Sequence, residues 1–211
     1  MKRILIAAVF AFAPAALAQD GFTQLFNGKD FTGWKIGGNQ TTFTVKDGAI
    51  VANGAPAHCF YDGPVMNHNF KNFELMVDVM TLPKSNGGIY FHTEYQPAGW
   101  PSKGFEVQVN VTHSDPIKSA SLYHVLDIGA DIIDPIIKDG EWFTEHIIVQ
   151  GKTVTVKLNG KQVVQWTQPA DWNGGREGPG RTIGAGSTFA LQGHDPGSTV
   201  QYKNIRVKAL P

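Results

Sequence analysis

The chain has little cysteine and no excess charge of either sign. Cys59 is the only cysteine among 211 residues, which excludes an internal disulfide and a cysteine-based metal cluster. We predict that Cys59 is a small buried hydrophobic residue rather than a reactive thiol. Lysine and arginine together number 18, as do aspartate and glutamate, which gives a net charge of 0 at pH 7. A basic field for nucleic acid or an anionic membrane is therefore lacking, and we expect a neutral ligand.

Long apolar runs are also scarce, and the one near the N-terminus is short. Two basic residues precede an apolar run over residues 4–12, and a small-x-small cleavage pattern ends at Ala18. This run is well short of the ~20 residues that a membrane-spanning helix needs. We therefore predict that residues 1–18 are a cleaved signal peptide. The remaining residues, 19–211, are expected to form a single periplasmic or secreted domain with no membrane span.

Helix signals are almost absent, whereas turn signals are frequent. Asn-Gly and Asp-Gly pairs recur along the chain, with short alternating or β-branched runs between them, which is typical of an all-β sandwich. The clearest hairpin joins residues 152–158 to residues 161–166 through Asn159-Gly160, a pair that suits a type I′ turn. The other predicted strands are residues 42–46, 73–80, 87–94, 104–110, 143–150, 187–192 and 199–208.

The segment 104–110 alternates strictly between apolar and polar residues. Because successive side chains of a strand point to opposite faces, three apolar side chains face the core and Glu106, Gln108 and Asn110 face the other way. One carboxylate and two amides in register indicate a site for a polar ligand.

The segment 87–94 repeats this alternation and places Tyr90, His92 and Glu94 on its polar face. If the two strands share a sheet, six polar side chains line one surface. Trp100 lies in an irregular segment beside them, where an aromatic ring is suited either to stacking on a sugar or to packing the loop onto the sandwich. The sequence leaves both interpretations of Trp100 open.

Several short motifs follow one another along the chain. They are Leu-Phe-Asn-Gly-Lys-Asp-Phe-Thr-Gly-Trp at 25–34, Asn-Gly-Gly-Ile-Tyr-Phe at 86–91, Phe-Glu-Val-Gln at 105–108, Leu-Asn-Gly at 158–160 and Leu-Gln-Gly-His at 191–194. In this order they resemble the 3-keto-disaccharide hydrolase domain family, also called DUF1080. The resemblance implies a concanavalin A-like jelly-roll β-sandwich, with long loops over a concave sheet that binds the ligand. His92 and Asn110 stand where members of that family commonly carry Arg and Asp.

The resemblance also implies a reaction. A carbonyl at C3 acidifies the hydrogen on C2, so a base can form an enolate that expels the aglycone from C1, and water then adds back. This chemistry needs a base, a stabiliser of the enolate oxygen and an acid. We assign Glu106 as the candidate base, Tyr123 as the candidate acid and His194 as a third catalytic candidate. The candidate substrate-binding residues are Tyr90, His92, Gln108, Asn110, Gln192 and Trp100.

The sequence does not identify a cofactor, and it leaves a divalent metal ion open. His92, Glu94, Glu106 and His194 are suitable ligand types for Zn²⁺ or a similar ion. None of them forms the H-x-x-x-H or H-E-x-x-H spacing that marks a zinc site.

Two other functions fit the same residues. A conventional glycosidase needs two carboxylates about 5 to 9.5 Å apart, and Glu94 would have to supply the second beside Glu106. A non-catalytic carbohydrate-binding module would use the same amides and aromatic rings. Each alternative has a carbohydrate as its partner, and the 3-keto reaction additionally implies a sugar 3-oxidase that supplies the substrate.

Overall fold

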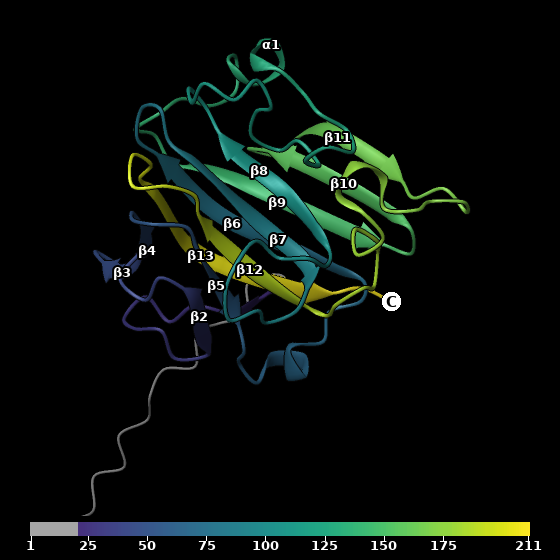
Figure 1. Cartoon of the computed structure of the whole chain (residues 1–211), viewed down its shortest axis with the longest axis horizontal. Coiled ribbons are helices and arrows are strands. Elements are labelled where there is room, and N and C mark those ends of the chain that lie inside the picture. Colours follow the sequence, from purple (N-terminus) through teal and green to yellow (C-terminus); the bar gives the residue numbers. More distant parts are fainter. Residues whose placement is uncertain (1–20) are drawn as a thin grey trace, which may run out of the picture.

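The computed structural model describes residues 21–211, so the predicted signal peptide lies outside the described residues. Two antiparallel sheets pack face to face, as Figure 1 shows, and the predicted all-β sandwich is confirmed. Helical structure is confined to short turns, namely Val65–His68, Ala130–Ile133 (α1) and Gly175–Glu177. Within the described range, no helix combines the length and the apolar character needed to cross a bilayer.

The larger sheet has eight strands. They are β1 (Thr23–Gln24), β3 (Phe43–Lys46), β4 (Ala49–Ala52), β6 (Phe73–Thr81), β9 (Phe143–Gln150), β10 (Thr153–Leu158), β11 (Lys161–Thr167) and β13 (Val200–Ala209). Their order is β11-β10-β9-β6-β13-β4-β3. Strand β1 pairs with Arg206 and Val207 of β13, beyond the residues of β13 that pair with β4. Strand β6 alternates between buried and half-buried residues, because one face of this sheet packs on the core and the other meets water.

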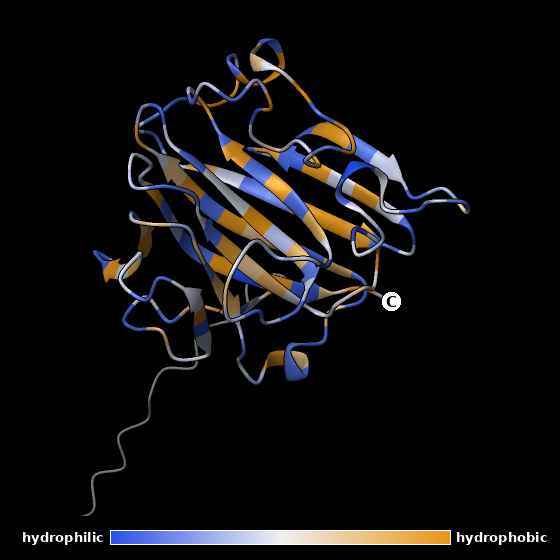
Figure 2. Ribbon diagram, viewed as in Figure 1, coloured by the Kyte–Doolittle hydropathy of each residue, from blue (hydrophilic) through white to orange (hydrophobic). Residues whose placement is uncertain are grey.

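The smaller sheet has five strands. They are β2 (Trp34–Gly38), β5 (Ala57–Tyr61), β7 (Asn86–Thr93), β8 (Phe105–Asn110) and β12 (Thr188–Gly193), in the order β2-β5-β12-β7-β8. Every residue of β7 and β8 is buried. Since only one face of the smaller sheet meets the larger one, the loops must cover the other face. Figure 2 shows how apolar and polar residues alternate along these strands.

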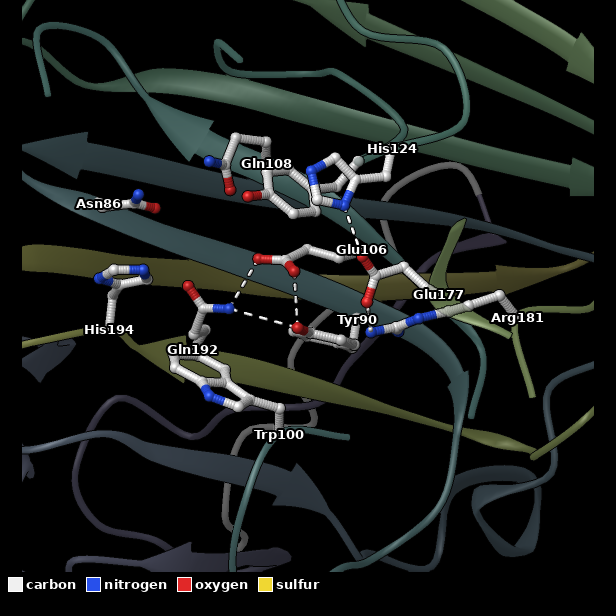
Figure 3. Close-up of a pocket in the computed structure, with 11 residues that line it drawn as sticks. Asn86, Tyr90, Trp100, Glu106, Gln108, His124, Glu177, Arg181, Gln192 and His194 are labelled. Atoms are coloured by element: carbon white, nitrogen blue, oxygen red, sulfur yellow. Dashed lines mark hydrogen bonds and ion pairs between the residues drawn. The ribbon is translucent and has the colours of Figure 1, made fainter. Parts of the chain in front are cut away.

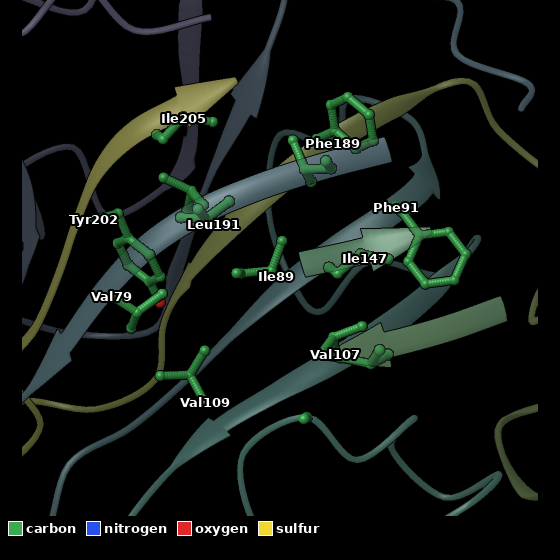
Figure 4. Packing of buried hydrophobic residues seen from close by; sticks show 14 of the residues in the cluster. Val79, Ile89, Phe91, Val107, Val109, Ile147, Phe189, Leu191, Tyr202 and Ile205 are labelled. Atoms are coloured by element: carbon green, nitrogen blue, oxygen red, sulfur yellow. The ribbon is translucent and has the colours of Figure 1, made fainter. Parts of the chain in front are cut away.

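The core lies between the two sheets. Figure 4 shows Ile89, Val107 and Leu191 of the smaller sheet beside Ile147 and Tyr202 of the larger one. Burial of such side chains is the dominant stabilising contribution to a fold of this kind. Cys59 is fully buried in the same core, as predicted. Phe105, Val107 and Val109, the apolar residues of the segment 104–110, lie in this core. The polar residues of that segment therefore lie on the opposite face of the sheet.

The sequence predicted most strands and missed a few. The Asn159-Gly160 hairpin forms between β10 and β11 as predicted, and all seven other predicted strands are present. Strands β1, β2, β4 and β5 were not predicted. Strand β2 ends in two glycines, and β5 is buried along its whole length without alternation, so both are held by their neighbours in the sheet rather than by strong local preference.

Candidate active site

Polar side chains form two rows across the outer face of the smaller sheet, the face directed away from the core. Gln192 on β12 is the direct partner of Gly88 on β7, and Gly88 is the partner of Gln108 on β8. In the next row, Tyr90 is the partner of Glu106. Directly opposed residues of a sheet point to the same face, so these side chains converge.

A pocket with a volume of about 240 Å³ opens over these rows (Figure 3). The strands β7, β8 and β12 supply its floor, and the connecting loops supply its walls. Its lining residues are Asn86, Tyr90, Trp100, Glu106, Gln108, Tyr123, His124, Glu177, Arg181, Gln192 and His194. Seven of the predicted site residues are among them, namely Tyr90, Trp100, Glu106, Gln108, Tyr123, Gln192 and His194.

Glu106 is the buried carboxyl at the floor of this pocket, with 7% of its surface exposed. The Tyr90 hydroxyl donates a hydrogen bond of 2.6 Å to Oε2, and the Gln192 amide donates one of 2.7 Å to Oε1. Burial raises the pKa of Glu106 from 4.5 to about 7, although these two hydrogen bonds and the Arg181 charge act in the opposite direction. A carboxyl with such a pKa exchanges protons readily near neutral pH, as a general base or acid requires.

Arg181 forms one wall of the pocket, and sequence reasoning missed it. Its guanidinium donates to the carbonyl oxygen of Gly104 at 3.2 Å and lies 5.4 Å from the centre of the Tyr90 ring. It also lies 3.9 Å from Oε2 of Glu177, whose other oxygen is 2.5 Å from Nδ1 of His124. Arg181 is therefore a fixed positive charge beside the Glu106 carboxyl.

The other residues that were missed are Asn86, His124 and Glu177. Asn86 begins strand β7, while Glu177 and Arg181 lie in the long irregular segment between β11 and β12. The length of that segment was the available signal, because long loops in a compact domain are usually functional or mobile. The positions of His124, Glu177 and Arg181 around the pocket depend on loop conformation, which the local sequence does not specify.

Tyr123 and His194 lie on the walls of the pocket. The Tyr123 hydroxyl donates to Oδ2 of Asp115 at 3.3 Å, and burial together with that carboxylate raises the pKa of Tyr123 to about 12. Tyr123 therefore carries its proton at neutral pH. Nδ1 of His194 lies 2.7 Å from Oδ2 of Asp195, and the His194 ring lies 5.4 Å from the ring of Trp100. Trp100 is 48% exposed at the rim, a position open to a stacking ligand.

His92 does not share this surface, so the prediction that it would line the pocket is wrong. Phe91 and His92 together lie opposite the single residue Phe189, which makes a β-bulge at the end of β7. His92 adopts a left-handed φ of 52°, and its ring is turned away from the pocket. Nε2 donates to the carbonyl oxygen of Lys71 at 2.9 Å, and Nδ1 accepts from the amide of Gly184 at 3.0 Å. The bulge breaks the alternation on which the prediction relied.

Asn110 is also absent from the pocket lining, and its side chain is instead hydrogen-bonded to a loop. Its amide group donates to the carbonyl oxygens of Asp115 and Ile117 at 2.9 and 2.8 Å. Its Oδ1 accepts from the backbone amide of His113 at 2.9 Å. The predicted role in substrate binding therefore has no geometric support, and the side chain instead fixes the loop that carries Asp115.

The four candidate metal ligands are not assembled into one site. Glu106 and His194 line the pocket, whereas His92 and Glu94 border a different depression of the surface. Glu94 is exposed and forms an ion pair of 2.8 Å with Lys103, so it is not the second carboxylate beside Glu106 that a conventional glycosidase would use. Across residues 21–211, no three His, Cys, Asp or Glu side chains are grouped as a metal site.

Comparisons with known proteins identify relatives that cover most of the chain. A family model of 3-keto-alpha-glucoside-1,2-lyase-like domains matches residues 21–208. A 3-keto-disaccharide hydrolase from Bacteroides thetaiotaomicron is 27% identical over 232 residues, which cover 90% of this chain and 79% of the relative. A crystal structure of a candidate glycosyl hydrolase from Parabacteroides distasonis superposes with a TM-score of 0.76 at 25% identity, covering 91% of this chain and 95% of that one. A carbohydrate-binding module from Bacillus subtilis shares the fold alone, with a TM-score of 0.55 at 10% identity, over 84% of this chain and 96% of that one.

Proposed function

Because the chain belongs to the family of 3-keto-alpha-glucoside-1,2-lyase-like domains, we propose that it is an enzyme that cleaves 3-keto-glycosides. The name of the relative from Bacteroides thetaiotaomicron supports a 3-keto-disaccharide as substrate. The name of the family supports an elimination across C1 and C2. The observation that carries the proposal is Glu106, a buried carboxyl that lines the pocket and has its pKa raised to about 7.

Glu106 acts as the base in the proposed reaction. Its carboxylate removes the proton from C2. The electrons of the C–H bond then form an enolate with the C3 carbonyl. The enolate collapses by forming the C1–C2 double bond and breaking the bond from C1 to the aglycone oxygen. Water then adds across this bond, with its hydroxyl on C1 and a proton returned to C2, so the net result is hydrolysis.

The surrounding residues supply the other parts of this chemistry. Tyr123 carries a proton at neutral pH and lies in the pocket wall, so it is our candidate donor to the leaving oxygen. Gln108, Gln192 and Arg181 carry hydrogen-bond donors suited to sugar hydroxyls and to the enolate oxygen. His194 is our third catalytic candidate, with its ring oriented by Asp195.

Substitution of Glu106 by Gln tests the proposal, because the amide preserves size and polarity but cannot accept the proton. Proton transfer by a positioned base is worth ~10² to 10⁴-fold in rate, so turnover of a 3-keto-disaccharide should fall by that factor while the melting temperature stays nearly unchanged. Glu94→Gln is the matched control, since Glu94 is exposed and outside the pocket. A rate close to that of the unchanged protein in Glu106→Gln would remove Glu106 from the role of base.

A non-catalytic carbohydrate-binding module is the second candidate function. The observation in its favour is the exposed Trp100 ring beside amide side chains, a combination that sugar-binding sites use. The same assay separates the two functions. Binding of the 3-keto-disaccharide without any turnover by the unchanged protein would select the binding module, and assays with and without a chelator would show whether a divalent metal ion takes part.

We propose in addition that the protein works in the periplasm or outside the cell after cleavage at Ala18. The charged start, the short apolar run and the small-x-small pattern of residues 1–18 support this location. The intact mass of the protein exported by its native host tests the cleavage position. The substrate also requires an enzyme that oxidises a sugar at C3, which we propose as the functional partner.

A further inference from the structure

The polar row on the outer face of the smaller sheet continues beyond the pocket. Gln108 and Gln192 line the pocket from β8 and β12, with Gly88 between them. The next residue of the same row is His58 on β5, which is the direct partner of Gln192. Because direct partners share a face, the His58 ring points to the same side as the pocket floor.

His58 is buried in an unusual way for a polar residue. Only 2% of its surface is exposed, and its Nε2 atom has no hydrogen-bond partner among residues 21–211. Burial, followed by the Arg181 and His194 charges, lowers the pKa of His58 to about 3, so the ring is neutral at any working pH. A buried polar atom without a partner costs free energy, and a group that bonds Nε2 of His58 would recover that cost.

Trp100 covers this part of the row. The centre of its ring lies 5.4 Å from that of His58, at an angle of 77° between the ring planes. The same indole lies 5.4 Å from the ring of His194 in the pocket wall, and 48% of Trp100 is exposed. Figure 3 shows Trp100 beside Gln192, on the side of the pocket away from Gln108.

The backbone of the loop that carries Trp100 is fixed. The Gln96 amide donates to the carbonyl oxygens of Ala98 and Trp100 at 2.7 and 2.8 Å. The amide of Gly38 on β2 donates to the carbonyl oxygen of Pro97 at 2.8 Å. For a ligand to reach Nε2 of His58, the indole would have to turn about its own side-chain bonds while the loop stays in place.

We propose that His58 and Trp100 form a second sugar subsite, which holds the aglycone ring of a 3-keto-disaccharide while Glu106 acts on the keto sugar. Nε2 of His58 bonds a hydroxyl of the second ring, and the indole stacks on its apolar face. This inference rests on the proposed function. A neutral pyranose fits this subsite because the His58 and Trp100 rings are uncharged and aromatic. Gln192 lies on the strand between the two subsites and can bond a sugar in either of them.

The test compares two substrates, a 3-keto-disaccharide and methyl 3-keto-glucoside, whose methyl group cannot reach the second subsite. His58→Phe keeps the aromatic packing and removes the polar atoms. We expect its KM for the disaccharide to rise about tenfold, which corresponds to ~1.4 kcal/mol, with kcat within about twofold. Its KM for the methyl glycoside should not change. His58→Gln, which restores a donor and an acceptor, should recover part of the loss.

Phe60→Leu is the packing control, because Phe60 lies two residues along the same face of β5 and carries no polar atom. It should leave the KM ratio of the two substrates unchanged. Equal effects of His58→Phe on both substrates, or no effect on either, would overturn the second subsite.

If the unchanged protein turns over neither substrate, the proposed function fails, and the subsite is decided by binding. Tryptophan fluorescence titrations with the same two compounds then compare the unchanged protein with His58→Phe. Weaker binding of the disaccharide alone would support the subsite, and identical affinities would overturn it.

Discussion

A Cβ atom on residue 88 would lie 2.2 Å from Oε1 of Glu106, so the glycine at this position leaves room for the carboxyl. Gly88→Ala should therefore displace the carboxyl and break its hydrogen bond with Gln192. A displacement of about 1 Å in a catalytic group typically costs ~10²-fold in rate. We expect kcat for a 3-keto-disaccharide to fall by about that factor, with a small change in melting temperature.

Gly129→Ala is the control for this prediction. Gly129 has φ −100°, which alanine also adopts, and its added Cβ would meet only the side chain of Asp131. Kinetics and thermal melts of the two variants should differ in kcat alone. Unchanged kcat in Gly88→Ala would mean that the position of the Glu106 carboxyl does not limit the reaction.

The pH dependence of turnover should report the Glu106 carboxyl. Burial raises its pKa to about 7, and only the ionised form accepts a proton, so kcat/KM should rise with pH through about 7 and then level off. The hydrogen bond from Tyr90 holds this pKa down, so Tyr90→Phe should move the rise to higher pH. A profile that is already flat above pH 5, or one that Tyr90→Phe leaves in place, would contradict the assignment.

The alternation of apolar and polar residues predicted the pocket floor wherever the strands stay regular. Glu106 and Gln108 follow the parity of β8, and both line the pocket. Parity failed at His92, because the bulge there depends on the pairing of β7 with β12, about a hundred residues further along the chain. Local sequence contains no signal for that pairing.

The walls of the pocket were harder to predict than its floor. Arg181 and Glu177 line the pocket from a loop whose path is set by tertiary contacts, such as the hydrogen bond from the amide of Gly104 to the carbonyl oxygen of Gly180. The sequence alone could not decide whether Trp100 stacks on a sugar or packs its loop onto the sandwich. The structure places the Trp100 side chain at the rim of the pocket, with 48% of its surface exposed. His58 was not predicted as a site residue, because β5 lacks any alternation.

Glu145 should make the protein less stable as the pH rises. Its side chain is fully buried on the core face of β9, and neither carboxyl oxygen has a hydrogen-bond partner within the described part of the chain. Burial raises the pKa of Glu145 well above 4.5, so the unfolded chain loses this proton at a lower pH than the folded protein does. The contribution of protonated Glu145 to the free energy of unfolding is therefore fully present below about pH 4.5. It is lost as the pH rises toward the pKa of the folded state, by ~1.4 kcal/mol per pH unit.

Glu145→Met removes the titrating group and keeps a similar volume. Urea unfolding at pH 5 and pH 8 should show a larger gain in the free energy of unfolding at pH 8 for this variant. Glu141→Gln, on an exposed turn, should show no such difference. Equal stabilisation at both pH values would indicate that Glu145 titrates alike in the folded and unfolded states.

Asn110→Asp should destabilise the protein even though the two side chains have nearly the same shape. The carboxylate loses both donors to the carbonyl oxygens of Asp115 and Ile117 and places a negative oxygen against them. Each unsatisfied buried group costs ~1 to 3 kcal/mol, and the Lys118 ammonium, 3.4 Å from Oδ1, offsets only part of this. We expect a loss of ~2 to 4 kcal/mol in the free energy of unfolding, measured by urea unfolding.

Activity below the melting temperature should also fall in Asn110→Asp, because the loop that Asn110 holds carries Asp115, the acceptor for the Tyr123 hydroxyl. The matched control is Asn39→Asp, since Asn39 uses only its oxygen, which accepts from the Thr41 amide at 2.9 Å, and a carboxylate does the same. This control should keep both stability and rate. Retained stability together with an altered KM in Asn110→Asp would instead place Asn110 in contact with the substrate.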